Sequence, residues 1–269
     1  MSWKYRVWRA IAGAYCLACG AGRPRPGLRV LCYHAVETPL PGDRWGLSLP
    51  RQSFRRQMEL LASGEFGRII PLGAASSPCA EPQVCVTFDD GYQDALTEVA
   101  PVLARLGLPF TVCVTPGLLG SSPAHLTDAS LVELSRRPGV EIGAHGLGHR
   151  KLTELSDHEL DRELSESRRR LEALIGRPVV SMTYPHGRSD LRVRDAAARA
   201  GFKVAGCSRY GLNGPGRDRL MLCRTEIVAW DDEESFRQKV LGGWDWFRFR
   251  RRDPARDGGG RAFDLPCAK

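Results

Sequence analysis

The sequence predicts an α/β fold in which parallel strands alternate with helices. Short β-branched runs alternate with helical patterns along residues 28–241, and no internal repeat is visible. Of the 269 residues, 42% are hydrophobic, which is enough for a sizeable core without disulfides or a structural metal. Such alternation gives strands joined by helical crossovers, either as a β/α barrel or as an open doubly wound sheet.

Seven runs are expected to be strands, because they are short, apolar and rich in β-branched residues. They are 28–33, 68–70, 84–88, 110–114, 140–144, 179–184 and 202–206. Six segments with helical spacing are expected between and after them, at 53–62, 92–106, 128–137, 156–175, 190–200 and 233–241. The longest begins with Ser156 and Glu159, a capping box, and Gly176 and Pro178 end it. No glycine-rich phosphate loop follows any strand, so a nucleotide-binding fold is not predicted.

The formal net charge of +8 lies in the two ends of the chain. Residues 1–29 carry six basic side chains and no acidic one, whereas residues 30–236 carry 24 basic and 27 acidic ones. We therefore expect three parts: a basic N-terminal segment at 1–27, a domain at 28–241, and a basic aromatic C-terminal tail at 242–269. A nucleic-acid enzyme would carry a basic stripe on its working domain, so no nucleic-acid partner is expected.

Cysteine usage and the N-terminal sequence bear on the location of the protein. The nine cysteines are scattered, with no spacing typical of a structural zinc site, which favours a reducing compartment. The longest apolar stretch, residues 10–22, is shorter than the roughly 20 residues that span a bilayer. We expect a cytoplasmic protein. The alternative is export, with this stretch as part of a signal peptide, because basic residues precede it.

Aromatic and cationic residues are interleaved at both ends, in Trp3–Arg9 and in Trp244–Arg252. Such segments can lie at an anionic membrane surface, which would place the protein at the inner face of the membrane in peripheral contact. The alternative is that their aromatic rings pack back on the domain.

Four of the expected strands end at side chains that can bind a metal or transfer a proton. These side chains are His34, Asp89 with Asp90, His145 followed by His149, and His186. Because the carboxyl ends of parallel strands face one side of a β/α fold, we expect these residues to gather at one rim.

Two neutral imidazoles and one carboxylate are a common set of zinc ligands that leaves one position open for water. Consecutive residues leaving a strand point in different directions, so Asp89 and Asp90 are expected to differ in role. One can bind the metal while the other acts as a base. A bound metal lowers the pKa of water toward ~7 and polarises a carbonyl, so hydrolysis of an acyl group becomes feasible.

Three motifs resemble the signature of one enzyme family. They are Val86-Thr-Phe-Asp89-Asp90-Gly-Tyr92, His145-Gly-Leu-Gly-His149 and Tyr184-Pro185-His186-Gly187. They resemble the NodB-homology polysaccharide deacetylases, carbohydrate esterase family 4, and the resemblance covers about residues 28–230 in order. It implies a distorted β/α barrel of about seven parallel strands. It also implies removal of N-acetyl groups from an amino-sugar polysaccharide or a lipid-linked glycan, with a divalent metal, expected to be zinc.

The resemblance further implies roles for the residues at the strand ends. Asp89 is the expected base for attack by a water molecule on the metal, and Asp90, His145 and His149 are the expected metal ligands. The backbone N–H of His186 is expected to stabilise the oxyanion together with the metal. The His186 side chain either binds substrate or faces solvent.

The family's usual C-terminal Leu-x-x-His, which carries the general acid, is missing, because no histidine follows His186. In the circularly permuted branch of the family this motif lies near the N-terminus, and Leu31-Cys32-Tyr33-His34 fits it. His34 is therefore the expected acid that protonates the leaving amine.

Two further positions depart from the family pattern. Thr183 stands where an arginine is common, and Arg224, after the strand-like run 220–223, is expected to orient Asp89 instead. Gly146 replaces a hydroxyl residue and is expected to loosen its loop.

Two alternatives stay open at this point. One is a related hydrolase of a formamide or another linear amide, similar to a deformylase. The other is a non-catalytic glycan-binding module, against which the intact acidic pair and histidine pair argue.

Overall fold

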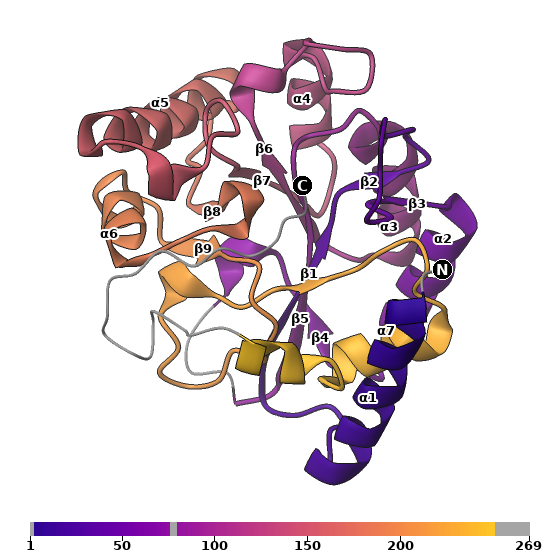
Figure 1. Cartoon of the computed structure of the whole chain (residues 1–269). Helices are drawn as coiled ribbons and strands as arrows, with labels where there is room; N and C mark the ends of the chain where they lie inside the picture. The colour runs from indigo at the N-terminus through magenta and orange to yellow at the C-terminus, as the bar shows by residue number, and fades with distance from the viewer. Residues whose placement is uncertain (1–2, 76–79, 251–269) are drawn as a thin grey trace.

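The computed structural model describes residues 3–75 and 80–250, and these form a curled parallel sheet surrounded by helices (Figure 1). The rest of the expected C-terminal tail, residues 251–269, lies outside the described residues. The strand order is β10-β1-β5-β6-β7-β8-β9, with β4 paired to β5, and every pairing in this sheet is parallel. A separate two-stranded sheet joins β2 and β3. The expected distorted barrel is thus confirmed.

The strands of the main sheet are β1 (Gly27–Tyr33), β4 (Arg68–Ile69), β5 (Pro82–Phe88), β6 (Phe110–Val114), β7 (Val140–Ala144), β8 (Ser181–Thr183), β9 (Val204–Gly206) and β10 (Thr225–Glu226). The small sheet consists of β2 (Ala35–Val36) and β3 (Ser48–Leu49). The α-helices are α1 (Trp3–Cys19), α2 (Arg51–Ala62), α3 (Ala100–Leu106), α4 (Asp128–Ser135), α5 (Asp157–Ile175), α6 (Leu191–Arg199) and α7 (Glu233–Leu241).

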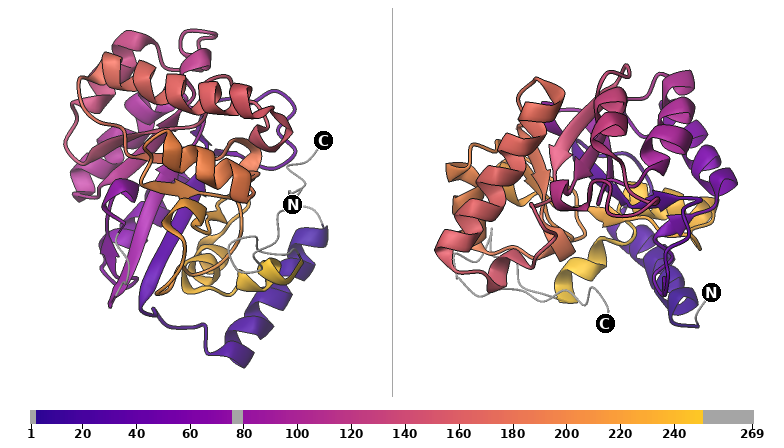
Figure 2. Two further views of the ribbon diagram at one scale, coloured as in Figure 1. Left: turned by 90° about the vertical axis from the view of Figure 1, so that its left-hand side faces the viewer. Right: turned by 90° about the horizontal axis from the view of Figure 1, so that it is seen from above.

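The central strands are apolar because both of their faces are covered. All seven residues of β1 and all five of β6 are buried, as parallel strands between a packed interior and outer helices must be. Figure 2 shows the helices on the outside of the sheet. At the carboxyl end of the pairing between β1 and β5, Tyr33 lies opposite Phe88, and their rings stack at 5.2 Å. This register places the next residues of both strands side by side.

Local sequence signals set the bounds of the long helix α5. The Ser156 side chain accepts from the backbone N–H of Glu159, and the Glu159 carboxylate accepts from the Ser156 backbone, which confirms the capping box. Gly176 ends the helix in the left-handed conformation, with φ 70°.

Two expected elements differ in the structure. The helix expected over 92–106 begins as a π-turn at Ala95–Val99 and becomes α-helical only at Ala100. Pro101 lacks an N–H, so a regular α-helical hydrogen-bond pattern cannot run unbroken through this segment. The run 220–223 is not a strand. Its first residues belong to a 3₁₀ turn at Arg219–Met221. The Asp218 side chain caps this turn by accepting from the Leu220 N–H. The strand β10 begins only at Thr225.

The N-terminal segment forms a helix, α1, that lies along the outside of the barrel beside α7 (Figures 1 and 2). Trp244, in the expected tail, is 1% exposed, and its ring lies 5.3 Å from that of Tyr5. Trp8 and Phe247 also meet edge to face. These aromatic rings therefore pack back on the domain, whereas Trp3 and Phe249 stay exposed.

Among the described residues, the structure contains no helix with the length and apolar character needed to traverse a bilayer.

A buried ionic network fastens α1 to the domain. Lys239 donates to the Asp231 carboxylate at 2.7 Å and to the Glu226 carbonyl at 2.8 Å, and both charged side chains are buried. The Tyr5 hydroxyl donates to the other oxygen of Asp231. Asp231 also accepts from the Val228 backbone N–H at 2.7 Å. One carboxylate thus joins α1, α7 and the loop after β10.

We expect Asp231→Ala to lower the free energy of unfolding by about 3–5 kcal/mol, because it leaves the Lys239 ammonium buried without its partner charge. Urea denaturation followed by circular dichroism measures this loss. The control is Asp195→Ala, which removes an exposed pair with Arg194 at 3.1 Å and should cost less than about 1 kcal/mol. Equal losses in the two variants would contradict the role given to the network.

Candidate metal and catalytic site

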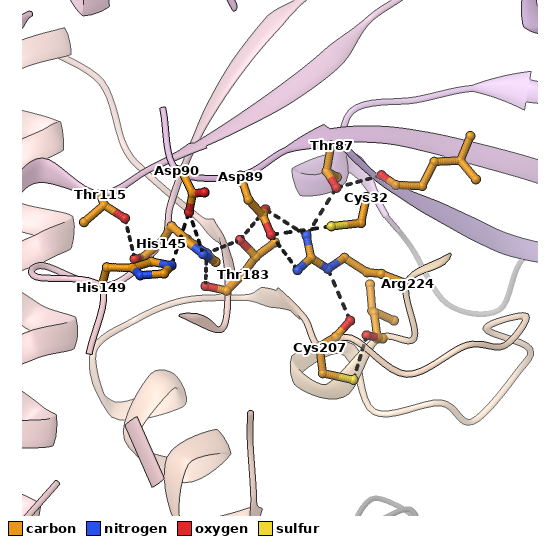
Figure 3. A network of polar contacts seen from close by, with 12 residues as sticks. Cys32, Thr87, Asp89, Asp90, Thr115, His145, His149, Thr183, Cys207 and Arg224 are labelled. Carbon is orange, nitrogen blue, oxygen red and sulfur yellow. Dashed lines mark hydrogen bonds and ion pairs between the residues drawn. The ribbon is translucent and has the colours of Figure 1, made fainter. Parts of the chain in front are cut away.

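The carboxyl ends of the strands bring the predicted residues to one rim (Figure 3). Asp89 and Asp90 follow β5, His145 follows β7, and His34 follows β1. Arg224 immediately precedes β10. Because all of these strands are parallel and neighbouring, side chains that are far apart in the sequence meet within a few ångströms.

Three side chains form a set that can hold a divalent metal. The Nε2 atoms of His145 and His149 lie 3.5 and 3.2 Å from Oδ1 of Asp90. This Oδ1 is buried and has no hydrogen-bond donor. Two imidazole nitrogens directed at one such oxygen leave room for a cation that all three would bind. Two histidines and one carboxylate match the ligand chemistry of zinc, so the residues present fit a metal.

The hydrogen bonds of His145 prepare it as a ligand. Its Nδ1 lies 2.9 Å from the carbonyl oxygen of Thr183 and 2.7 Å from the Thr183 hydroxyl. A carbonyl can only accept, so Nδ1 carries the proton and Nε2 presents its lone pair toward Asp90. Burial lowers the pKa of His145 to about 4, which keeps the ring neutral at physiological pH.

Backbone strain is concentrated at this site. Among the described residues other than glycine, four have positive φ, and three of them belong to the site: Asp90 at 72°, His149 at 55° and His186 at 58°. Side chains with a Cβ rarely adopt this conformation, which costs of order 1–3 kcal/mol for each residue. The surrounding contacts must therefore hold these residues in place.

Contacts from α5 hold the loop that carries His149. The buried Glu163 carboxylate accepts from the backbone N–H groups of Leu147 at 3.1 Å and Gly148 at 2.6 Å. The Ser167 hydroxyl donates to the carbonyl of Gly146 at 2.9 Å. These bonds fix the position of the second histidine relative to the first.

Gly146, which departs from the family pattern, adopts a backbone conformation that favours glycine. Its φ is 69°, and a Cβ here would lie 3.0 Å from a side-chain carbon of Pro185. A glycine therefore permits both the turn and the close approach of the Tyr184-Pro185-His186 segment.

Asp89 lies beside the metal set and is paired with Arg224. The guanidinium donates to both carboxylate oxygens at 2.8 Å, and both side chains are almost fully buried. Burial by itself raises the pKa of Asp89, but the charge and the hydrogen bonds of Arg224 outweigh burial and hold the pKa far below its usual range. Asp89 is therefore ionised at physiological pH, as a proton acceptor must be.

Thr183 links the carboxylate to the metal set. Its hydroxyl donates to Oδ1 of Asp89 at 2.9 Å and accepts from Nδ1 of His145. The Cys32 thiol approaches Oδ2 of Asp89 at 3.5 Å. Sequence reasoning treated Thr183 only as the place of a missing arginine and gave Cys32 no role. Their position at strand ends beside predicted site residues was the available signal.

His34 lies beside Asp89, where the register of β1 and β5 places it. Ligand atoms of His34, Cys32 and Asp89 are all within 4.8 Å of one another. Nδ1 of His34 is buried without a hydrogen-bond partner. The N-terminal Leu-x-x-His thus brings an imidazole to the predicted base.

The His186 side chain packs against the metal set. Its ring lies 4.5 Å from the ring of His149, and its Nε2 is 3.2 Å from the His149 carbonyl oxygen. The ring is half-buried and faces the loop that carries the second histidine, so open solvent does not surround it.

We expect Thr183→Val to weaken zinc binding about tenfold, because it removes the hydroxyl that accepts from His145 and donates to Asp89. The matched control Thr183→Ser keeps the hydroxyl and should bind zinc within about threefold of the wild type. Titration against a chromophoric chelator measures both. Equal zinc affinity in the valine and serine variants would exclude a role for the hydroxyl in orienting the ligand.

Comparisons with known proteins agree with this geometry. A family model described as polysaccharide deacetylase matches residues 77–205. A Bacillus subtilis (strain 168) protein, YxkH, provisionally named a polysaccharide deacetylase, is 25% identical over 205 residues, covering 74% of this chain and 71% of its own.

Two solved structures share the fold. The Streptococcus pyogenes deacetylase PplD in complex with acetate has a TM-score of 0.69 at 22% identity, covering 80% of this chain and 99% of its own. IcaB from Ammonifex degensii has a TM-score of 0.67 at 21% identity, covering 82% and 98%. At these identities the likeness shows the fold alone. With the family match, the curated relative and the site residues taken together, the chain is similar to the polysaccharide deacetylase family.

Proposed function

We propose that this protein is a metal-dependent hydrolase that removes N-acetyl groups from an amino-sugar polysaccharide or a lipid-linked glycan. The observation that carries the proposal is the placement of an ionised, buried Asp89 directly beside the set Asp90, His145 and His149. A metal-dependent amide hydrolase uses this combination of a base and a Lewis-acid site. The match of residues 77–205 to the polysaccharide deacetylase family model supports the substrate class.

The metal would be held by Asp90, His145 and His149, and we propose zinc, since this donor set matches its preference. A metal at this position acidifies a water molecule and polarises the acetyl carbonyl.

In this proposal the residues of the chain position and move the protons. Asp89 accepts the proton of the attacking water, while Arg224 and Thr183 hold its carboxylate in a fixed orientation. His34, which lies beside Asp89, gives a proton to the leaving amine. The backbone N–H of His186 donates to the oxyanion that develops on the acetyl oxygen.

We also propose a cytoplasmic location at the inner surface of the membrane. The seven cysteines within the described residues are not joined in disulfides, which suits a reducing compartment, and Cys79 and Cys267 lie outside them. A lipid-linked glycan would be accessible from this location.

We expect Asp89→Asn to lower acetate release from N-acetylated glycans by a factor of about a thousand while zinc content stays near the wild-type value, because the asparagine cannot accept the proton. His145→Ala should lose both zinc and activity, because it removes a ligand. Acetate assays and elemental analysis of the same preparations test both. Full activity of Asp89→Asn would refute the assignment, and release of formate instead of acetate would favour the formamide hydrolase.

We expect His34→Ala to lower the rate about a hundredfold or more, because the leaving amine would lose its proton donor. The matched control is His158→Ala. His158 is an exposed histidine in the first turn of α5 and does not follow a strand, so its replacement should leave the rate unchanged. A near-normal rate for His34→Ala would reject its assignment as the acid.

A further inference from the structure

The outer face of α1 is apolar although it is exposed. Trp3, Val7, Ile11 and Leu17 are 71%, 44%, 41% and 88% exposed. The first three are spaced by four residues, and Leu17 lies six beyond Ile11, so all of them fall on one side of an α-helix. Ala10, Ala14 and Ala18 on the same side are also exposed, and Arg6 is the one cation among these exposed residues. We call this set the α1 outer face.

The α1 outer face is held outward by contacts on the opposite side of the helix. Tyr5 and Ala12 are buried, and the Tyr5 hydroxyl donates to Asp231. Arg9 forms ion pairs with Asp232 and Glu234 at the start of α7. Turning the helix to hide its outer face would break these contacts and expose the buried rings of Tyr5 and Trp244. The exposure is therefore a fixed feature of the fold.

From this arrangement we infer that the α1 outer face docks on an anionic phospholipid membrane. The charge around it is complementary, because Arg6, Arg23 and Arg25 are exposed and residues 1–29 contain no acidic side chain. Arg9 and Arg29 are not counted here, since both are paired with carboxylates of the domain. Apolar side chains enter the headgroup boundary while arginines meet lipid phosphates, which is how interfacial helices bind. The helix has 17 residues and lies along the surface of the domain, so it would lie in the plane of the interface.

A second copy of the chain fits this face less well. A helix of 17 residues is about 25 Å long and presents a strip of about 250 Å² on one side. A stable protein interface buries about 800 Å² on each partner. Two copies would also bring two basic segments together, which repel each other.

Docking through α1 would set the orientation of the whole enzyme. Tyr5, near the start of α1, contacts Trp230 and Asp231, which follow β10 on the side of the sheet where the site lies. Because α1 also leads to the amino end of β1, it lies along the side of the barrel, and the barrel would therefore rest sideways on the membrane. The docking of α1 on a membrane extends the proposed function. The choice of a lipid-linked substrate rests on that function. Vesicle binding by itself does not depend on that function.

The test is co-sedimentation of the full chain with phosphatidylcholine vesicles, with and without about 30% phosphatidylglycerol. The wild type should bind the anionic vesicles, bind neutral vesicles at least tenfold more weakly, and lose part of its binding at about 0.5 M NaCl. Ile11→Glu/Leu17→Glu should lower the partition coefficient at least tenfold. The control Arg169→Glu, on the exposed surface of α5, changes the net charge by the same two units and should stay within about twofold of the wild type.

Because Leu17 is 88% exposed, Leu17→Glu alone cannot disturb packing and serves as the second variant. It should lower binding several-fold with an unchanged melting temperature. Equal losses in Arg169→Glu would overturn the inference, since overall charge would then explain the binding. Absence of vesicle binding by the wild type would overturn it as well. So would a dimer in light scattering that the α1 variants dissociate, which would assign the face to a second copy.

Discussion

The buried ion pair between Asp89 and Arg224 is the interaction on which the rest of the site depends. It joins the end of β5 to the residue before β10. Thr183, at the end of β8, also donates a hydrogen bond to the Asp89 carboxylate, so a third strand contacts it. Removing either charge would leave the other buried and unpaired, at a cost of several kcal/mol. The pair therefore fixes one carboxylate relative to three strands. It also holds that carboxylate ionised next to the metal set, although burial alone would favour the neutral acid.

The metal set shows how a rigid sheet supports a strained loop. Asp90 and His149 both have positive φ, which an isolated chain would rarely populate. Glu163 on α5 satisfies two backbone donors of the histidine loop, and Thr183 fixes the tautomer of the other histidine. These supports come from elements that are separate in sequence. The ligand geometry is thus a property of the packed domain, and a preformed site of this kind needs little rearrangement when a cation binds.

Ion pairs within the domain determine which cations are available to a partner. Several cations near the ends of the chain are not free for a partner: Arg29 pairs with Asp245 at 2.6 Å, and Lys239 pairs with Asp231. Trp244 is buried among these groups. Within the described residues near the two ends, four exposed large apolar side chains lie on α1, and Phe249 is the one in the C-terminal segment. The structure thereby separates one candidate surface from two segments whose sequences look equally aromatic and basic.

Local sequence determined much of this protein, because its signals act over a few residues. Apolar β-branched runs predicted the central strands, a capping box set the start of α5, and the motifs with Asp89, Asp90, His145 and His149 identified the candidate site before any contact was known. Tertiary structure alone decided the role of Thr183, the support from Glu163, the true position of β10, and the packing of α1 and Trp244. Each of these depends on which strands are neighbours and in which register, and the energy of such long-range contacts is not encoded in any single stretch of the chain.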